Sequence, residues 1–354
     1  MFNLSVWRLI AIAVFFTSFS TTVSAAPPST TRSENSIAAK ASDLFDSRNF
    51  AEYLEPHVAQ VVNGYEAKVY WAKTKKTYTV RLLGSGSAFF VSQDGKMITN
   101  NHVIDLSEKP SEEQVLRAFV RDRIQEDDPN SDEFWADDFP SQVTISELTT
   151  VEEVRFSNGE ARPYTVIKAG GGQGIDLALI QVEGIRNAPA LKLATSDARS
   201  LSRVISIGFP GVIGTLFPNP RATVGEGTVS GKQKMEDSSD VLHTTLQISA
   251  GHSGSPVLNQ QAEVVGVATF VAREDERYSF ALPASDILAF LEAAGVSNQA
   301  SETSAIYRDA ISLYNQGNAG SALSKFLKVN TLFPYDAQIQ EFIENCRQRI
   351  IGKL

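Results

Sequence analysis

Short runs of aromatic and β-branched residues fill the middle of the chain, from about residue 65 to residue 282. The first two runs, 66–71 and 78–83, flank the polar segment Lys73-Thr74-Lys75-Lys76, which is typical of a β-hairpin. Gly, Pro, Asn and Asp separate the later runs, which lie at 88–91, 97–99, 151–156, 164–167, 177–182, 204–207, 223–230, 244–248, 264–271 and 278–282. Many short strands with few helices predict an antiparallel sandwich or barrel architecture.

Helices are predicted outside these runs by their end signals. Ser111 and Gln114 have the spacing of a capping box, and the apolar residues that follow them fall on one helical face. A helix over 283–294 is followed by Gly295 in the C-cap position. The range 38–62 has mixed helical periodicity and predicts a further helix before the strands.

An acidic stretch, 126–138, follows the first of these helices. It contains the alternating oxygen donors Asp128, Asn130 and Asp132. The calcium-loop pattern then fails, because Glu133 stands where the turn glycine belongs and Phe139 where the closing glutamate belongs. We therefore interpret the stretch as a solvated loop that holds no metal.

The first 25 residues have the pattern of an export signal. Arg8 is the only basic residue before an apolar run at 9–16, and Val23-Ser24-Ala25 is a small-x-small cleavage site. The run is shorter than the roughly 20 residues that span a bilayer. We expect cleavage after Ala25 and an exported protein, periplasmic or extracellular, with no stable membrane insertion; an uncleaved anchor is the alternative.

Charge and cysteine content narrow the function further. The chain has 354 residues and a formal net charge of −9, whereas phosphate binding needs a basic surface, so a nucleic-acid partner is not expected. Cys346 is the only cysteine, which excludes a disulfide within the chain. Its helical, apolar surroundings favour a buried structural thiol over a reactive one.

The segment Gly251-His252-Ser253-Gly254-Ser255-Pro256 carries candidate chemistry. A serine hydroxyl becomes a nucleophile only when a base removes its proton and donors stabilise the oxyanion. The glycines permit a tight turn in which the N–H groups of Gly251 and Ser253 converge on such an oxyanion. Taken alone, the segment fits an ordinary Gly/Ser turn equally well.

A histidine and an aspartate complete the set. His102 ends a strand–turn–strand pattern over 86–99, and Asp176 opens the apolar strand 177–182. A buried carboxylate that accepts an imidazole N–H fixes the tautomer of the ring and stabilises the imidazolium. A core histidine and a turn-capping aspartate are the plain alternatives, but the order His, Asp, Ser is one of the arrangements of a catalytic triad.

Taken together, these segments resemble the chymotrypsin-like serine peptidases of the HtrA/DegP kind. The motifs that carry the resemblance are Gly86-Ser87-Ala88-Phe89, Asp94-Gly95, Thr99-Asn100-Asn101-His102-Val103, Asp176-Leu177-Ala178-Leu179 and 251–256. The similarity covers about residues 64–294. It implies two antiparallel six-stranded β-barrels, a triad of His102, Asp176 and Ser253, an oxyanion hole made by the N–H groups of Gly251 and Ser253, and no metal or cofactor.

The chain departs from the family pattern at several points. His252 replaces the usual Asn or Asp before the serine, and Ser255 replaces the usual Gly. No PDZ-like segment follows the barrels, and a helical insertion at 108–140 enlarges a loop of the first barrel. We expect the insertion to be a candidate lid over the site.

The resemblance also places the substrate-binding residues. Counted from Ser253, the floor of the primary pocket falls near Gln247 and Ile248, and neither is an acid, so cleavage after Lys or Arg is not expected. Thr269-Phe270-Val271 is the expected edge that pairs with the substrate backbone. We favour an apolar or small residue before the cleaved bond, with glutamate as the rival.

Beyond the barrels, residues 303–336 resemble one tetratricopeptide repeat, with the spacing of its roughly 34-residue unit. The matching residues are Ala310, Gln316-Gly317-Asn318-Ala319, Ala322-Leu323, Phe326, Val329 and Pro334. Residues 335–351 predict a third helix. One repeat cannot bury its apolar face alone, so the unit either packs against the barrels or binds a protein partner through 303–351, and the sequence leaves both open.

We therefore predict a mainly β protein with four parts. These are a signal peptide (1–25), a linker and N-terminal helix (26–63), a trypsin-like serine protease domain (64–298, with the insertion 108–140) and a small all-α helical-repeat unit (299–354). The predicted function is a serine endopeptidase for exported or misfolded proteins and peptides. The alternatives are a non-catalytic, chaperone-like peptide-binding module and a resting enzyme whose lid opens when a partner engages the repeat.

Overall fold

In the computed structural model of the chain, residues 47–121, 142–170, 175–211, 221–235, 239–272 and 275–352 are described. The predicted signal peptide and the acidic stretch 126–138 lie outside these residues. All of the described residues belong to one unit of the chain, residues 41–354. Within them, no helix is both long and apolar enough to cross a bilayer.

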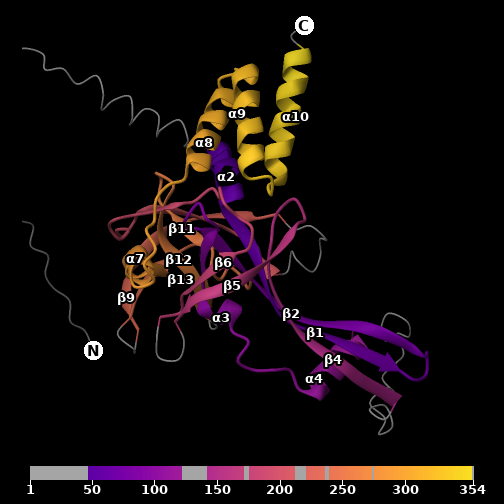
Figure 1. Ribbon diagram of the computed structural model, residues 1–354. Helices are drawn as coiled ribbons and strands as arrows, with labels where there is room; N and C mark the ends of the chain where they lie inside the picture. The colour runs from indigo at the N-terminus through magenta and orange to yellow at the C-terminus, as the bar shows by residue number, and fades with distance from the viewer. Residues whose placement is uncertain are drawn as a thin grey trace, which may run out of the picture. The chain divides into compact units, whose positions relative to one another are not determined.

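Six antiparallel strands form the first barrel (Figure 1). They are β1 (Val58–Trp71), β2 (Lys76–Phe90), β3 (Lys96–Thr99), β4 (Val143–Arg155), β5 (Ala161–Ala169) and β6 (Ala178–Val182). Their order is β1-β2-β3-β6-β5-β4, and pairing of β1 with β4 closes the ring. The predicted hairpin at 66–83 is confirmed as part of the much longer β1–β2 pair.

The second barrel is built from the strands that follow the inter-barrel linker. They are β8 (Arg203–Gly208), β9 (Thr223–Lys234), β10 (Asp240–Thr244), β11 (Pro256–Leu258), β12 (Glu263–Ala272) and β13 (Asp275–Pro283). Pairing of β11 with both β8 and β12 closes a ring of six strands, and the short β7 (Lys192–Leu193) adds to β12 in parallel. The predicted pair of six-stranded barrels is therefore confirmed.

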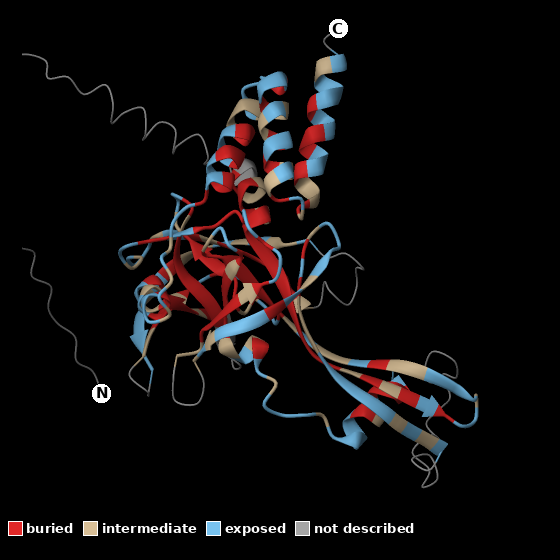
Figure 2. Cartoon of the chain, in the orientation of Figure 1, coloured by how far each residue is buried: buried red, intermediate tan, exposed pale blue. Residues whose placement is uncertain are grey.

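Buried residues concentrate in the strands of the two barrels and along parts of the C-terminal helices (Figure 2). Parts of β2 and β6 are fully buried: Ala88 to Phe90 on β2 and Ala178 to Ile180 on β6 have no exposed surface. Burial of this apolar surface is the main stabilising contribution to such a fold.

Strands β1, β2 and β4 continue beyond the barrel as a three-stranded arm (Figure 1). Along β1 the arm alternates between buried and more exposed residues, which is the period of a sheet with one covered face. Helix α4 (Glu112–Phe119), whose predicted capping box at Ser111 is confirmed, covers that face. Its Phe119 ring lies 5.8 Å from Trp71 and 5.3 Å from Tyr78 between ring centroids, so the arm has a small core of its own.

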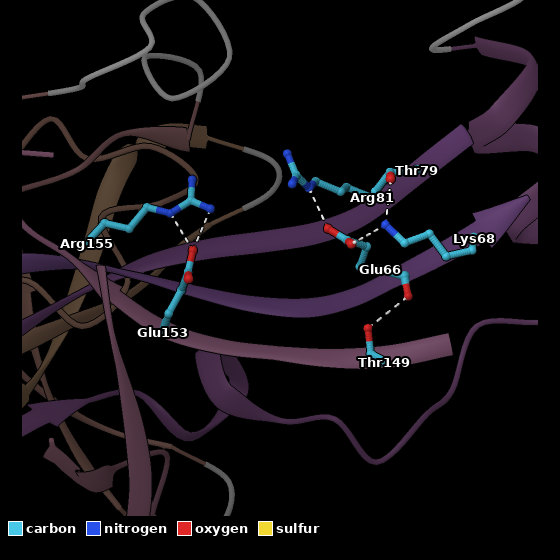
Figure 3. Close-up of polar contacts among 7 residues, drawn as sticks. All are labelled: Glu66, Lys68, Thr79, Arg81, Thr149, Glu153 and Arg155. Atoms are coloured by element: carbon cyan, nitrogen blue, oxygen red, sulfur yellow. Dashed lines mark hydrogen bonds and ion pairs between the residues drawn. The ribbon is translucent and has the colours of Figure 1, made fainter. Parts of the chain in front are cut away.

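The other face of the arm is polar (Figure 3). Glu66 on β1 accepts hydrogen bonds from Arg81, directly opposite on β2, and from Lys68, at 2.9 and 3.2 Å. Lys68 also donates to Thr79 on β2 at 2.8 Å. Such cross-strand pairs favour one register of the strands.

Two segments differ from the sequence prediction. Strand β1 begins at Val58, inside the range expected to be linker and helix, and the described part of that helix is only α2 (Ser47–Leu54) with a 3₁₀ turn, η2 (Glu55–His57). The strand predicted at 244–248 is wrong, because β10 ends at Thr244. Apolar alternation continues through buried Leu246 and half-buried Ile248, but this backbone has left the ladder after an irregularity at His243/Thr244.

The C-terminal region is helical, as expected. Helix α7 (Ala284–Glu292) is followed by Gly295 at a φ of 67°, which confirms the predicted stop signal. The next helices are α8 (Glu302–Asn315), α9 (Ala319–Leu332) and α10 (Ala337–Ile351). Cys346 on α10 is buried, as predicted.

These three helices pack onto the barrels at two places. Phe333, between α9 and α10, is buried against Phe90 and Phe156 of the first barrel. Ser301, the N-cap of α8, accepts the N–H of Ala190 in the inter-barrel linker at 3.1 Å. Helix α2 supplies further apolar surface, so the helical unit does not bury its apolar face alone.

A second polar cluster lies where α10 begins. Asp336, its N-cap, is buried and accepts hydrogen bonds from Ile339 N and Ser157 Oγ. Burial raises the pKa of Asp336 to about 6. Burial, followed by repulsion from Asp336, raises the pKa of Glu55 to about 7. Ionisation of these carboxyl groups therefore destabilises the folded state.

The sign of the pH effect follows from these shifts. A carboxyl whose folded pKa is raised stabilises the fold below its unfolded pKa and loses that contribution as the pH rises through its folded pKa. For Glu55 the window runs from pH 4.5 to about 7. His57 acts in the opposite sense, because burial lowers its pKa to about 3, and so only a comparison of variants isolates Glu55.

We predict that Glu55→Gln raises the free energy of unfolding at pH 8 by up to about 3 kcal/mol, and that the gain disappears near pH 4.5. Denaturant unfolding of both proteins across this pH range measures the difference. Glu183→Gln, at an exposed turn, is the control and leaves the pH profile unchanged. A Glu55→Gln profile parallel to that of the wild type would contradict the assignment.

Candidate active site

His102 and Asp176 are brought together by the pairing of β3 with β6. These strands are antiparallel neighbours with Thr99 opposite Ala178, so the residues just after β3 and just before β6 meet at the same edge. His102 lies on the short helix α3 (Asn101–Ile104) that follows β3. Its Nδ1 is 2.8 Å from Asp176 Oδ2, and its backbone N–H donates to Asp176 Oδ1 at 3.0 Å.

The hydrogen bonds around Asp176 keep this carboxylate ionised. Its partial burial would raise its pKa, but the hydrogen bonds from the His102 ring and backbone, and from Thr269 Oγ1 at 2.8 Å, hold the pKa below its ordinary value. Asn100 Nδ2 donates to the Asp176 carbonyl at 2.8 Å and fixes the backbone of the aspartate. An ionised, oriented carboxylate is what an imidazole base requires.

Ser253 enters the site from the second barrel. It lies between β10 and β11, and its hydroxyl donates to the Thr269 carbonyl at 3.0 Å. Thr269 therefore contacts both the nucleophile candidate, through its carbonyl, and Asp176, through its hydroxyl. Among the described residues, Ser253 makes no hydrogen bond to His102, so the hydroxyl must turn away from Thr269 before it can pass its proton to the imidazole.

The backbone around Ser253 forms a tight turn that begins at a glycine with positive φ. Gly251 has a φ of 96°, and a Cβ there would lie 2.2 Å from Gly211 N, so only glycine fits. The Ala250 carbonyl accepts from Gly211 N at 2.7 Å, and the His252 carbonyl from Ser255 N at 2.9 Å. In trans peptides this turns the N–H groups of Gly251 and Ser253 to the opposite side. Neither N–H has a protein acceptor in the described part of the chain.

His252 points away from this chemistry. Its side chain is 7% exposed. Its Nδ1 accepts from Ser249 N at 3.1 Å, and its Nε2 is 3.3 Å from Thr223 Oγ1. Burial lowers the pKa of His252, so it is neutral at pH 7. This histidine holds the serine loop rather than acting on Ser253.

The described part of the insertion does not cover His102, the candidate base. The His102 side chain is 51% exposed, and α4 packs on the arm instead. Removal of the whole insertion would uncover Trp71 and Val80, so a deletion of 108–140 changes the stability of the arm as well as any cover over the site.

The predicted substrate-binding residues fall into two groups. Gln247 is exposed and Ile248 half-buried against the core of the second barrel, after β10. Thr269, Phe270 and Val271 lie on β12. Thr269 is buried, and it hydrogen-bonds to Asp176 and Ser253. The register of β12 pairs Phe270 with Phe280 and Val271 with Ser279.

Residues that the sequence interpretation assigned no role complete the site. Asn100 was quoted only within a motif, and Ser87 hydrogen-bonds to Gly251, Phe209 and Ser253. For Thr269 the expected role was substrate pairing, and its hydroxyl bond to Asp176 had no sequence signal. Ser87 and Asn100 lie within the two sequence motifs that precede and contain His102, and this was the only feature of the sequence that could have indicated a role for them.

Comparison with known proteins agrees with this geometry. The sequence model of the trypsin-like peptidase domain matches residues 86–267, which is just over half of the chain. The chain therefore belongs to the trypsin-like peptidase family. The curated relatives that the chain matches include proteins named as HtrA serine proteases and as a DegP-like endoprotease.

Three curated relatives illustrate the match. Human "Serine protease HTRA4" is 30% identical over 215 residues, covering 58% of this chain and 34% of the relative. Rat "Serine protease HTRA3" is 28% identical, with 59% and 37% covered. The "Probable periplasmic serine endoprotease DegP-like" of Chlamydia pneumoniae is 28% identical, with 56% and 32% covered. The chain thus spans about a third of the length of these relatives.

Among solved structures, the active form of the Rv3671c protease from M. tuberculosis aligns with a TM-score of 0.43 at 16% identity. The alignment covers 80% of this chain and 97% of that chain. A likeness this weak adds nothing to the strand topology, on which the fold assignment stands.

We predict that Thr269→Val lowers the rate of peptide hydrolysis about tenfold to a hundredfold, because a hydrogen bond to a charged group contributes about 1.5–3 kcal/mol. Thr269→Ser retains the hydroxyl and is the matched control. Steady-state rates between pH 5 and 9 measure the effect. Equal rates for the Val and Ser variants would show that the bond to Asp176 does not matter.

Proposed function

We propose that the protein is an exported serine endopeptidase in which His102, Asp176 and Ser253 form the catalytic triad. The observation that carries the proposal is the double contact between His102 and Asp176, at 2.8 and 3.0 Å. Ser253 lies on a loop whose Gly251 and Ser253 N–H groups have no protein acceptor among the described residues. Membership of the trypsin-like peptidase family supports it.

The chemistry follows the positions of these groups. Ser253 Oγ attacks the carbonyl carbon of the scissile peptide, and His102 Nε2 takes the hydroxyl proton. The N–H groups of Gly251 and Ser253 bind the oxyanion of the tetrahedral intermediate. His102 then passes the proton to the leaving amine, and an acyl-enzyme remains on Ser253.

The second half of the reaction repeats these steps with water. His102 takes a proton from a water molecule, which attacks the acyl carbon, and then returns the proton to Ser253 Oγ as the new carboxyl product leaves. Asp176 keeps the ring of His102 in the tautomer with Nδ1–H and stabilises the imidazolium in both halves. No step needs a metal, and no cluster of metal-binding side chains occurs among the described residues.

The resting serine has one adjustment to make. Its hydroxyl donates to the Thr269 carbonyl, and rotation about the Cα–Cβ bond redirects it to His102 Nε2. Catalytic hydrogen bonds are often long or misaligned before substrate binds.

Polypeptides in extended conformation are the proposed substrates. The backbone at 269–271 lies near the end of β12, beyond the last backbone–backbone hydrogen bonds between β12 and the serine loop at Ala268, and offers an edge for strand addition. The absence of an acid at Gln247 and Ile248 favours an apolar or small residue before the cleaved bond. The export pattern at 1–25 predicts action on exported or misfolded proteins outside the cytoplasm, and the "periplasmic" relative supports this.

We predict that the mature protein, residues 26–354, cleaves a permanently unfolded protein at internal bonds, and that Ser253→Ala abolishes cleavage. Loss of a triad serine lowers kcat by about a millionfold in a comparable enzyme. Mass spectrometry of the fragments gives both the rate and the cleavage sites. Ser324→Ala, at an exposed serine of α9, is the control and keeps the wild-type rate.

Two outcomes would contradict the proposal. Cleavage that persists in Ser253→Ala would assign the activity to another group. Binding of the unfolded chain by folded wild-type protein without cleavage would favour the non-catalytic peptide-binding alternative.

A further inference from the structure

Ser87 occupies an unusual position between the two barrels. It lies on β2 of the first barrel and has no exposed surface, yet its hydroxyl and its backbone N–H bind residues of the second barrel. Its hydroxyl donates to the Gly251 carbonyl at 2.9 Å and accepts the Phe209 N–H at 2.9 Å. Its backbone N–H donates to the Ser253 carbonyl at 2.8 Å.

We propose that the Ser87 hydroxyl is a positioning residue for the oxyanion hole, because it fixes the peptide plane between Gly251 and His252. The proposal rests on the proposed function. Ser87 does not touch the substrate in this scheme. It acts through the backbone that does.

The first step concerns the four carbonyl groups of residues 250–253. Each is held by one donor: Ala250 by Gly211 N, Gly251 by Ser87 Oγ, His252 by Ser255 N, and Ser253 by Ser87 N. Every peptide plane of the loop is therefore fixed from its carbonyl side. Ser87 supplies two of the four donors, and it alone supplies one from a side chain.

The second step concerns the conformational freedom of the backbone at Gly251. Glycine accepts positive and negative φ at little cost, so the peptide planes on either side of Gly251 are the ones most free to rotate. The bond from Gly211 restrains the plane before Gly251. The plane after it is held on its N–H side by the bond from His252 N to the Ser249 carbonyl at 3.0 Å, and on its carbonyl side by the bond from Ser87. Without the Ser87 bond, only the contact with Ser249 holds this plane, so Gly251 gains freedom in ψ and the directions of the two N–H donors spread.

The third step is the direction of the Ser87 proton. A hydroxyl has one proton, and the Phe209 N–H approaches the Ser87 oxygen as a donor. The proton of Ser87 is therefore free to point at the Gly251 carbonyl. The chain Phe209 N–H to Ser87 O–H to Gly251 C=O is polarised along its length, which strengthens each bond.

The backbone of Ser87 is itself held in place by contacts of its carbonyl group. The Ser87 carbonyl accepts the Thr99 hydroxyl at 2.7 Å, and Thr99 ends the strand that leads to His102. A Cβ on Gly254 would lie 1.9 Å from the same carbonyl, so the serine loop packs directly on Ser87. One residue thus connects the strand before the base with the loop that carries the nucleophile.

The test measures kcat and KM of Ser87→Ala on a quenched peptide substrate, together with inhibition by a peptide boronate of the same sequence. We expect kcat to fall about tenfold to a hundredfold, which is at or below the effect of removing a whole oxyanion donor. KM stays within about twofold, because the ground-state carbonyl does not depend on the hole. Boronate affinity falls by the same factor as kcat/KM, because the tetrahedral adduct uses the hole.

Ser206→Ala is the matched control. Ser206 is buried on β8, and its hydroxyl has no hydrogen-bond partner among the described residues, so the same chemical change breaks no bond. It is expected to keep the wild-type kcat. Ser87→Cys keeps the packing but weakens the donor, and it is expected to fold and to show an intermediate kcat with an unchanged KM.

The outcomes separate this inference from the function on which it rests. A wild type that does not hydrolyse the substrate overturns the proposed function. If the wild type is active and Ser87→Ala has the same kcat as Ser206→Ala, the role of Ser87 is overturned. The same holds if Ser87→Ala raises KM but keeps the wild-type kcat. If Ser87→Ala fails to fold, Ser87→Cys decides: an unchanged kcat overturns the role, and a reduced kcat with unchanged boronate affinity does the same.

Discussion

The structure depends on one constraint: the groups proposed for catalysis are divided between two barrels, so the position of one barrel relative to the other must be fixed. His102 and Asp176 stand on the first barrel and Ser253 on the second. Few direct bonds cross between them at this point. Among the described residues they include the bond from the Thr269 hydroxyl to Asp176, the bonds from the backbone and hydroxyl of Ser87 to Ser253 and Gly251, and the bond from Phe209 N–H to the Ser87 hydroxyl. Each barrel needs its own core to be stable, but the site exists only through these crossing bonds.

The helical unit extends the same principle to the outside of the barrels. Asn298 donates to the carbonyls of Val91 and Leu191, and accepts the N–H of Leu193, so the segment before α8 is bonded to the inter-barrel linker. Phe333, between α9 and α10, is buried in the same apolar cluster as residues of the first barrel. These contacts favour the barrel-packing interpretation of the C-terminal helices. Partner docking through 303–351 stays a prediction, and the buried Asp336 and Glu55 make the packing sensitive to pH.

Local signals in the sequence predicted much of this fold. The hairpin around Lys73–Lys76, the capping box at Ser111 and the stop at Gly295 each depend on near neighbours, and each is where it was expected. Non-local pairing was harder to predict. The outer part of β4, 143–150, is polar because most of it is exposed. Residues 245–248 continue the alternation of a strand after β10 has ended. For the site, a motif resemblance nominated His102, Asp176 and Ser253. Ser87 and the Thr269 hydroxyl matter only through atoms more than 70 positions away, which no local pattern encodes.

The most direct test of the account is whether Ser253 is an activated nucleophile. Mature protein is treated with a fluorophosphonate probe, and the adduct is located by peptide mass spectrometry. Labelling confined to Ser253, and lost in both His102→Ala and Ser253→Ala, is the result that the account predicts. A folded wild type that stays unlabelled, or one labelled equally well without His102, would contradict the claim that the two barrels together build a catalytic triad.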